Sequence, residues 1–255
     1  MSLTSEQEQV AAFGEGGLVL VAAAGTGKTH TITQRVVRLI NKGVTPSKIL
    51  CITFTNKAAQ EMKERISATT GIGLESLSIF TFHGFCNYWL RKEGHRMGKK
   101  NYTIMDQETT NNAIKSICSS TALDQASYNA IENPDIKAKF LTNENADQLK
   151  DKFKSAKTYI SKVSALGVMA GEAILTRINL PYARQVFRKY EEYKATMNLM
   201  DFEDLHKYGT ALFNHYLRIN EVYEYLQVDE AQDCGEKDLH LLKAINISNI
   251  LAVGD

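Results

Sequence analysis

Cysteine is scarce in this sequence and is not clustered. No two of the four cysteines form a Cys-x-x-Cys pair, which excludes the common zinc motifs, and their wide separation argues against a disulfide framework. We expect these side chains to be unreactive packing residues in a reducing compartment. The four positions are Cys51, Cys86, Cys118 and Cys234.

Long apolar runs and an excess of charge are missing as well. No stretch approaches the roughly 20 apolar residues that a membrane span needs, and the opening segment MSLTSEQEQV lacks the pattern of a signal peptide. We therefore predict a cytoplasmic protein without a membrane partner. Lysine and arginine total 30 against 29 for aspartate and glutamate, a net charge of +1. This balance neither indicates nor excludes a nucleic-acid partner, because a local groove can still be basic.

Glycine is abundant only in the first part of the chain. Eleven of the 16 glycines lie between Gly14 and Gly98, whereas residues 99–208 contain two. The glycine-rich part holds three apolar stretches, LVLVAA, ILCITFT and LSIFTF, each followed by a helical pattern. Near-continuous apolar strands of this kind are typical of a parallel sheet buried on both faces. The expected helices, at 28–42 and 57–66, each present one apolar stripe to that sheet.

The middle of the chain has a helical pattern without strand runs. Its clearest apolar stripe is backed by lysines, which we interpret as a solvated face, with a contact to duplex DNA as the alternative. Strand character returns in VYEYLQVDEA and NILAVGD. We predict an α/β domain with an inserted all-α subdomain: a first part at 1–88, the insertion at 89–200 and a second part at 201–255. The stripe comprises Leu149, Phe153, Ala156 and Ile160, and the lysines are Lys150, Lys152, Lys154 and Lys157.

Two aspartates follow the predicted insertion in the segment MDFEDL. Asp201 is predicted to cap the helix that follows it, and Asp204 would lie in the first turn, where a carboxylate favours the helix dipole. We therefore assign Asp201 a structural role and not a catalytic one.

A phosphate-binding loop is predicted between the first apolar strand and the helix that follows it. The pattern G-x-x-x-x-G-K-[ST] aligns with AAAGTGKT (22–29), with Ala22 in place of the first glycine. Backbone N–H groups would hold the phosphates, Lys28 would reach the terminal ones, and Thr29 would bind Mg²⁺. Alanine at positive φ costs roughly 1–2 kcal/mol, so we expect Ala22 and Ala23 to keep negative φ. The alternative is an ordinary strand–turn–helix.

A site of this kind also needs a carboxylate at the end of a neighbouring strand. The segment YLQVDEAQD supplies Asp229 and Glu230 at such a point. Asp229 would organise the water shell of Mg²⁺, and Glu230 would polarise an attacking water as general base. The alternative is that both residues only begin a polar loop. The long separation between Lys28 and Asp229 leaves room for the helical insertion.

With these residues in place, the chain resembles the N-terminal part of the superfamily 1 DNA helicases of the UvrD/Rep/PcrA type over nearly all of its length. The resemblance implies a RecA-like P-loop NTPase sheet with an inserted all-α subdomain, and ATP and Mg²⁺ as cofactors. LTSEQEQV is similar to the glutamine motif of that family, which places Gln7 on the adenine edge, where an amide can donate and accept. VDEAQD is similar to the magnesium motif, in which Gln232 helps to couple the nucleotide to other motifs.

Relatives often carry an arginine after the Lys-Thr pair that packs on the base. His30 stands at this position, where it either takes that place or is an exposed helix residue. The implied nucleotide-binding residues are Gln7, Ala24, Gly25, Thr26, Gly27, Lys28, Thr29 and Gln232, the implied metal ligands are Thr29 and Asp229, and the implied catalytic residues are Lys28 and Glu230.

Two further motifs resemble DNA-contacting segments of the family. TFTNKAAQEMKERI (53–66) implies that the residues opening a helix contact the sugar-phosphate backbone, with Phe54 close to a base; the alternative is a capped helix with Phe54 in the core. TFHGFC (81–86) implies a second contact, and the alternative is that His83 is a buried histidine with its hydrogen bonds satisfied. The implied DNA-binding residues are Phe54, Thr55, Asn56, Lys57, Thr81 and His83.

The resemblance implies an ATP-driven motor that moves 3′-to-5′ on single-stranded DNA. Its implied partners are single-stranded DNA, single-strand/duplex junctions and repair or replication proteins. ILAVGD is similar to the start of the third motif of the family and breaks off at Asp255, before a second RecA-like domain that supplies arginine fingers. We therefore expect a truncated first motor domain that alone hydrolyses ATP negligibly and does not translocate. The alternatives are an ATP-dependent nucleic-acid-binding switch and a small-molecule phosphotransferase.

Overall fold

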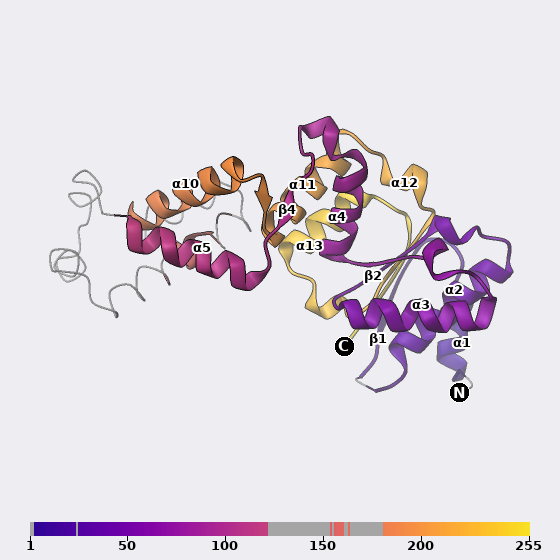
Figure 1. Cartoon of the computed structure of the whole chain (residues 1–255). Coiled ribbons are helices and arrows are strands. Elements are labelled where there is room, and N and C mark those ends of the chain that lie inside the picture. Colours follow the sequence, from indigo (N-terminus) through magenta and orange to yellow (C-terminus); the bar gives the residue numbers. More distant parts are fainter. Residues whose placement is uncertain (1–2, 24, 122–153, 155, 161–162, 164–180) are drawn as a thin grey trace. The chain divides into compact units, whose positions relative to one another are not determined.

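The chain divides into two compact units. The computed structural model describes residues 3–23, 25–121, 154, 156–160, 163 and 181–255 (Figure 1). One unit consists of residues 1–100 and 208–255, and the other of residues 101–207. The sequence places the boundaries at residues 88 and 200 instead, because its glycine and strand patterns do not show how far the flanking helices continue to pack on the sheet.

The first unit contains a five-stranded sheet with helices between its strands. The sheet order is β1-β7-β6-β2-β3, and every neighbouring pair is parallel. The carboxyl ends of all five strands therefore lie along one edge of the sheet. The elements are α1 (Ser5–Ala12), β1 (Gly17–Val21), α2 (Lys28–Asn41), η1 (Pro46–Lys48), β2 (Ile49–Thr53), α3 (Asn56–Thr70), η2 (Leu74–Ser76), β3 (Ser78–Thr81), α4 (Phe82–Glu93), η3 (Gly94–Met97), α12 (Ile219–Val222), β6 (Tyr225–Val228), η4 (Ala231–Asp233), α13 (Glu236–Ile245) and β7 (Asn249–Gly254).

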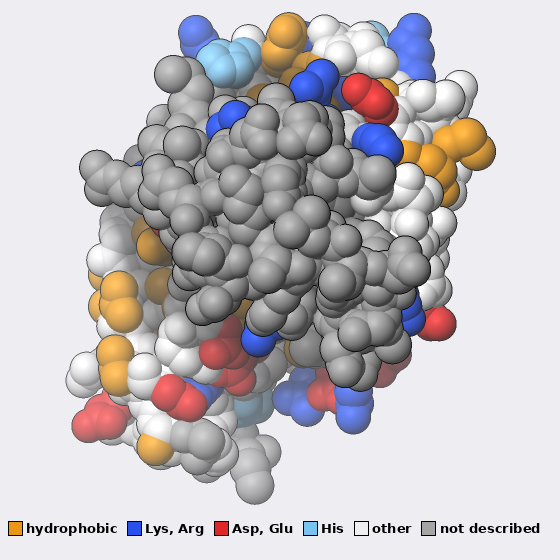
Figure 2. Space-filling model, turned by 90° about the vertical axis from the view of Figure 1, so that its left-hand side faces the viewer, with side chains coloured by type: hydrophobic (Ala, Val, Ile, Leu, Met, Phe, Trp, Pro, Cys, Tyr) orange, Lys and Arg blue, Asp and Glu red, His pale blue; other side chains and the backbone are white. Residues whose placement is uncertain are grey.

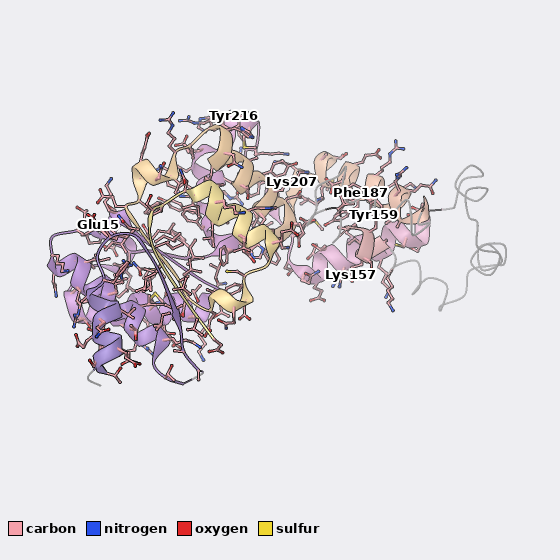
Figure 3. All side chains as sticks on the ribbon, turned by 180° about the vertical axis from the view of Figure 1, so that it is seen from behind. Glu15, Lys157, Tyr159, Phe187, Lys207 and Tyr216 are labelled. Carbon is pink, nitrogen blue, oxygen red and sulfur yellow. The ribbon has the colours of Figure 1, made fainter. Side chains whose placement is uncertain are left out.

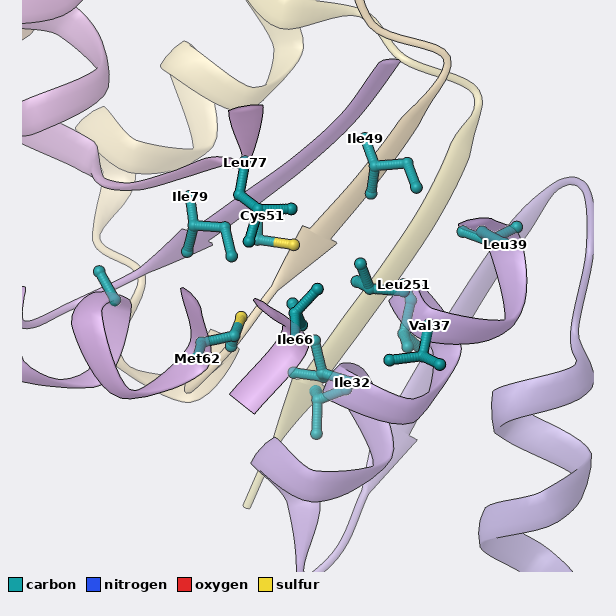
Figure 4. Packing of buried hydrophobic residues seen from close by; sticks show 13 residues of the cluster. Ile32, Val37, Leu39, Ile49, Cys51, Met62, Ile66, Leu77, Ile79 and Leu251 are labelled. Carbon is teal, nitrogen blue, oxygen red and sulfur yellow. The ribbon is translucent and has the colours of Figure 1, made fainter. Parts of the chain in front are cut away.

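Helices α2 and α3 cover one face of this sheet (Figure 4). The apolar stripes predicted for them point inward: Ile32 and Val36 of α2 are buried, as are Met62 and Ile66 of α3. Both helices are placed as predicted, but α3 begins one residue earlier and ends four residues later than expected. Its last turn continues to Gly71, whose φ of +74° ends the helix.

The opposite face is packed by aromatic side chains of α4 and its neighbours. Phe85 of α4 is fully buried, and its ring lies 5.8 Å from that of Phe80 in β3. The same ring lies 5.3 Å from Phe213 and 6.0 Å from Tyr223. Because this face is closed by α4, residues 89–100 stay with the sheet and not with the helical unit.

The prediction of burial on both faces is wrong for β1. Leu18 and Leu20 pack against the α2 side, but Val19 and Val21 are 70% and 72% exposed. β1 is an edge strand, so its second face lacks the cover that the central strands receive. On that face Ile250 of the neighbouring β7 lines a cavity of about 580 Å³ together with residues of α13. An apolar sequence alone does not reveal that a strand lies at the edge.

The second unit has its own apolar core. Tyr159 and Phe187 lie side by side, with ring centroids 5.5 Å apart (Figure 3). β4 and β5 form a two-residue parallel pair, which the sequence did not predict because two residues show no period. The elements are β4 (Thr103–Ile104), α5 (Gln107–Ser120), α10 (Pro181–Thr196), β5 (Leu199–Met200) and the start of α11 (Phe202–His215).

Two of the four residues in the predicted apolar stripe of the middle region lie among the described residues. Ala156 and Ile160 are buried in this second core, as expected. Lys154 and Lys157 are exposed, as a solvated face requires. The remaining members of the stripe and of the lysine row, at 149, 150, 152 and 153, lie outside the described residues.

The predicted capping role of Asp201 is confirmed. Its Oδ1 accepts a hydrogen bond of 2.8 Å from the N–H of Asp204, and Asp204 Oδ2 accepts one of 3.3 Å from the N–H of Asp201. This reciprocal pair fixes the first turn of α11.

The described surface gives no sign of a membrane-spanning element. Among the described residues, no helix is both long enough and apolar enough to cross a membrane. On the face shown in Figure 2, the coloured lysine and arginine side chains are interspersed with aspartate and glutamate. This mixture agrees with a net charge of +1 for the whole sequence.

Candidate functional site

The loop between β1 and α2 is built for close approach of a ligand to its backbone. Gly25 and Gly27 have φ of +78° and +87°, which favours glycine at both positions. Ala22 and Ala23 are not among the residues with positive φ, so the prediction for them is confirmed. The N–H of Ala22 donates to the carbonyl of Gly254 (3.0 Å), which ties the loop to β7. Ala24, a predicted nucleotide contact, lies outside the described residues.

Gln7 contacts this loop from α1. Its Nε2 donates to the carbonyl oxygen of Thr26 (2.7 Å), and its Oε1 accepts from the N–H of Thr4 (2.9 Å) as part of a capping box. A Cβ atom on Gly27 would come within 3.2 Å of Gln7 Nε2, so α1 lies directly against the loop. An amide nitrogen and oxygen can each form a further hydrogen bond, which leaves Gln7 able to contact a base.

Lys28, the first residue of α2, points into a group of oxygens. Its Nζ donates to the carbonyl of Ala22 (3.2 Å) and to the carboxylate of Asp255, and it lies 3.8 Å from Glu230 Oε2. The hydrogen bond that Lys28 donates to Asp255 raises the pKa of Lys28 above its ordinary value, and burial works in the opposite direction. The ammonium is therefore charged and aimed at the position where strand ends β1, β6 and β7 meet the loop.

Thr29 and Asp229 are brought together by the fold. Thr29 Oγ1 donates to Asp229 Oδ2 over 3.1 Å, although the two residues are far apart in the sequence. Asp229 is 2% exposed, and this burial raises the pKa of its carboxyl, an effect that the hydrogen bond from Thr29 opposes. A hydroxyl and a carboxylate oxygen suit Mg²⁺, which prefers oxygen ligands and keeps several waters. The residues present therefore fit the predicted metal.

Glu230 and Gln232 follow Asp229 and link it to the end of β7. Glu230 has φ of +53°, a conformation that costs a non-glycine residue of order 1–3 kcal/mol and is concentrated at functional sites. Its Oε2 accepts from Gln232 Nε2 (2.9 Å), and Gln232 Oε1 accepts from the N–H of Asp255 (3.0 Å). Gln232 therefore joins the carboxylate proposed as base to the strand end that faces Lys28.

The two predicted DNA motifs lie at neighbouring strand ends on the same edge of the sheet. β2 pairs with β3 so that Thr53 lies opposite Thr81. Thr55 Oγ1 accepts from the N–H of Ala58 (3.1 Å) and caps α3, and Thr81 Oγ1 accepts from the N–H of Gly84 (3.0 Å) and caps α4. Two helix N-termini, each with partly positive backbone N–H groups, therefore open side by side.

The remaining side chains of these motifs differ in exposure. Asn56 is exposed, and Lys57 is 87% exposed with its Nζ 4.0 Å from Glu61. Phe54 is half-buried, with its ring in a T-shaped contact with Phe82 at 5.3 Å, so it is neither a core residue nor a free platform. His83 is half-buried and has an interaction partner.

The sequence did not identify two participants in this site. Asp255 ends a predicted motif, and its carboxylate also binds Lys28. No sequence pattern singles out Arg35, yet it is fully buried. His30 is half-buried, and its Nε2 has no hydrogen-bond partner among the described residues, so it is not the exposed helix residue of the alternative.

Comparison with known proteins decides the family. Residues 3–255 match the family model of the UvrD/REP helicase N-terminal domain. The chain belongs to the UvrD/REP helicase family. The predicted family and the predicted α/β fold with a parallel sheet are therefore confirmed.

Relatives within the UvrD/REP family cover this chain almost completely. The chain is 32% identical over 267 residues to the ATP-dependent DNA helicase PcrA of Staphylococcus aureus. The matched region covers 99% of this chain and 33% of the relative. It is 31% identical over 268 residues to the ATP-dependent DNA helicase PcrA of Staphylococcus epidermidis, and that match covers 100% of this chain and 33% of the relative. The chain therefore spans about a third of the length of these UvrD/REP relatives.

Proposed function

We propose that this chain is the ATP-binding motor domain of an ATP-dependent DNA helicase that translocates on single-stranded DNA. One observation carries the proposal: the glycine loop between β1 and α2 and two capped helix N-termini lie along a single edge of one parallel sheet. The loop and the Thr29–Asp229 pair follow β1 and β6, and the caps at Thr55 and Thr81 follow β2 and β3. A nucleotide and a nucleic-acid backbone can thus be held on the same rigid sheet.

The nucleotide half of the site divides the work among a few groups. The loop N–H groups and the ammonium of Lys28 bind the phosphates, and the amide of Gln7 reads the base. Thr29 and Asp229 hold Mg²⁺, which neutralises phosphate charge when it is bound. The carboxylate of Glu230 accepts a proton from the attacking water as that water forms a bond to the γ-phosphorus and the bond to the β-phosphate oxygen breaks.

The nucleic-acid half binds the backbone more than the bases. The N-termini of α3 and α4 and the exposed ammonium of Lys57 attract phosphates. The accessible part of the Phe54 ring provides a stacking surface for one base. Gln232 is hydrogen-bonded to Glu230, which follows β6, and to Asp255, which follows β7. A movement of Glu230 or Asp255 when the γ-phosphate is lost can therefore shift the ends of both strands.

Membership of the UvrD/REP family supports the finer parts of this proposal. They are 3′-to-5′ movement, action at single-strand/duplex junctions, repair or replication proteins as partners, and a cytoplasmic location. The family resemblance, and not the contacts described above, distinguishes DNA from RNA, because phosphate contacts and stacking do not report a missing 2′-OH.

The test is ATP turnover by the longest natural protein that contains this chain. Rates are compared with no nucleic acid, single-stranded DNA, single-stranded RNA and blunt duplex. We expect stimulation by single-stranded DNA that is lost in Lys28→Ala. Glu230→Gln should still bind ATP but lose turnover by roughly 10²–10⁴-fold, as for removal of a general base.

A pair of lysine variants tests the nucleic-acid half separately. Lys57→Ala should weaken single-stranded DNA binding and reduce the slope of log K against log salt by about 0.7, the value for one phosphate contact. The matched control is Lys42→Ala. Lys42 is an exposed lysine at the C-terminal end of α2, away from the sheet edge that carries the predicted DNA contacts, so its loss should leave the slope unchanged. Turnover that is indifferent to nucleic acid, with equal slopes for both variants, would favour a switch or a phosphotransferase instead.

A further inference from the structure

Arg35 is a charged side chain in the interior of the first unit. It lies on α2, the helix that begins with Lys28, and its side chain is 0% exposed. Its guanidinium donates to three oxygens, none of them a carboxylate: Phe13 O (3.1 Å), Gly14 O (3.0 Å) and Gln227 Oε1 (2.7 Å). It also lies 5.8 Å and 5.9 Å from the ring centroids of Phe13 and Tyr225. Burying an arginine without a carboxylate partner is costly. We therefore expect the three hydrogen bonds that its guanidinium donates to have a specific role.

The carbonyls that Arg35 binds belong to the connection between α1 and β1. α1 lies alongside α2 (Figure 1) and carries Gln7, whose amide rests on Thr26 in the phosphate loop. Arg38, one turn further along α2, pairs with Glu8 of α1. Helix α2, which begins with Lys28, therefore holds α1 through the buried Arg35 and through Arg38 at the surface. Gln7 lies in the first turn of α1.

The third acceptor extends this connection to the metal-binding strand. Gln227 lies on β6, two residues before Asp229, and is itself fully buried. One guanidinium thus joins the connection behind Gln7 to the strand that positions Asp229. Because an arginine fork is planar and pre-organised, small shifts of either segment break its hydrogen bonds.

We propose that Arg35 is a positioning residue for base recognition: it holds α1 so that the amide of Gln7 faces the nucleotide base, and it thereby sets a preference for ATP over GTP. This inference rests on the nucleotide binding proposed above. The edge of adenine offers one donor and one acceptor, which an amide matches, whereas guanine offers two acceptors there. The phosphates are bound by N–H groups of the loop and by Lys28, whereas Gln7 of α1 contacts a carbonyl oxygen of the loop, that of Thr26. Loss of Arg35 should therefore change selectivity and leave phosphate affinity in place.

The test measures binding of three probes to the 255-residue chain, each with Mg²⁺: ATP, GTP and tripolyphosphate. Two hydrogen bonds to the base predict a preference of roughly tenfold or more for ATP over GTP in the wild type. Gln7→Ala and Arg35→Met should reduce this preference to within about threefold, as expected when those hydrogen bonds are lost, while tripolyphosphate affinity stays within about twofold. Arg35→Lys, which keeps the charge, should be intermediate because one ammonium cannot satisfy three separated acceptors.

Met62→Ala is the matched control for a purely structural effect. Met62 is buried on α3 in the core that α2 and α3 share, and the variant destabilises that core without removing a hydrogen bond to the connection between α1 and β1. It should keep the preference for ATP at temperatures where circular dichroism shows a folded chain. If Arg35→Met weakens all three probes equally, as a destabilised fold would, the inference is overturned.

The other outcomes separate the inference from the function on which it rests. If Gln7→Ala loses the preference and both Arg35 variants keep it, Arg35 does not position the glutamine, and nucleotide binding stands. If the wild type binds ATP and GTP equally, base recognition by Gln7 is wrong. If the wild type binds neither ATP nor tripolyphosphate, the proposed nucleotide site itself fails.

Discussion

Removing the ammonium of Lys194 should destabilise the second unit strongly. Lys194 is 5% exposed, and its Nζ lies 2.7 Å from Asp204 Oδ2, 3.1 Å from Asp201 Oδ2 and 2.8 Å from Glu191 Oε1. The two aspartates are themselves 4% and 5% exposed. Lys194→Met would leave both carboxylates buried without a cation, and breaking a buried pair in this way costs about 3–5 kcal/mol.

The aspartates should respond differently to this loss. Among the described residues, Asp201 keeps a hydrogen bond from Tyr190 Oη (2.7 Å) and one from the N–H of Asp204, whereas Asp204 keeps the 3.3 Å bond from the N–H of Asp201 alone. Burial and the charge of Asp201 already raise the pKa of Asp204, although the nearby ammonium of Lys194 opposes the shift. Without Lys194, we expect Asp204 to take up a proton in the folded state.

The pH dependence of the variant follows from this proton. A carboxyl whose pKa is raised by folding binds more protons in the native state, so its contribution to stability falls as pH rises through that range. The stability deficit of Lys194→Met should therefore shrink as pH is lowered from neutral, because Asp204 then becomes protonated in the folded state. In the wild type, burial raises the pKa of Asp201, but the charge of Lys194 and the hydrogen bonds from Asp204 N–H and Tyr190 together outweigh it, so the pKa is lowered. The contribution of Asp201 to stability is therefore present above its unfolded pKa and is lost in acid.

The assay is urea unfolding followed by circular dichroism at several pH values. Trp89, the single tryptophan, lies in the first unit and reports separately on that unit by fluorescence. The matched control is Lys189→Met, an exposed lysine on the same helix, which should change stability by less than about 0.5 kcal/mol. Asp204→Asn added to Lys194→Met should recover part of the loss. A deficit below about 1 kcal/mol, the scale of a surface pair, or one that is independent of pH, would refute the reasoning.

Three further predictions concern the first unit. A Cβ at Gly254 would lie 2.7 Å from Gln232 Oε1 and 3.0 Å from its backbone N, so Gly254→Ala should displace Gln232 and lower stability by about 1–3 kcal/mol in urea unfolding. In the longest natural protein that contains this chain, the same change should reduce ATP turnover, and unchanged turnover would contradict the linking role of Gln232. Thr81→Ala should lower stability by about 1 kcal/mol through loss of the α4 cap while Thr81→Ser keeps it, and equal midpoints for the two variants would count against the cap. Cys234 is half-exposed with its pKa raised by burial to about 11, whereas the other three cysteines are buried, so a thiol reagent at pH 8 should modify Cys234 slowly and the others only after unfolding, as mass spectrometry would show.

The local parts of the fold could be predicted because short-range interactions decide them. The apolar stripe of α2, the absence of positive φ at Ala22 and Ala23 and the cap at Asp201 each depend on residues within a few positions of one another. The pairing of Thr29 with Asp229 could be anticipated too, since residues after neighbouring parallel strands meet at one edge. Their roles toward nucleotide and DNA stay predictions.

The rest was decided by tertiary structure. The sequence of β1 is as apolar as that of a central strand, and only the strand order shows that Val19 and Val21 face outward. Arg35 looks like any polar helix residue until the connection before β1 and the side chain of Gln227 close around it. Periodicity and capping are properties of neighbouring residues, so the sequence alone determined the elements and the loop. Edge exposure and the partners of a buried charge depend on which distant segments pack together, so only the folded chain determined those.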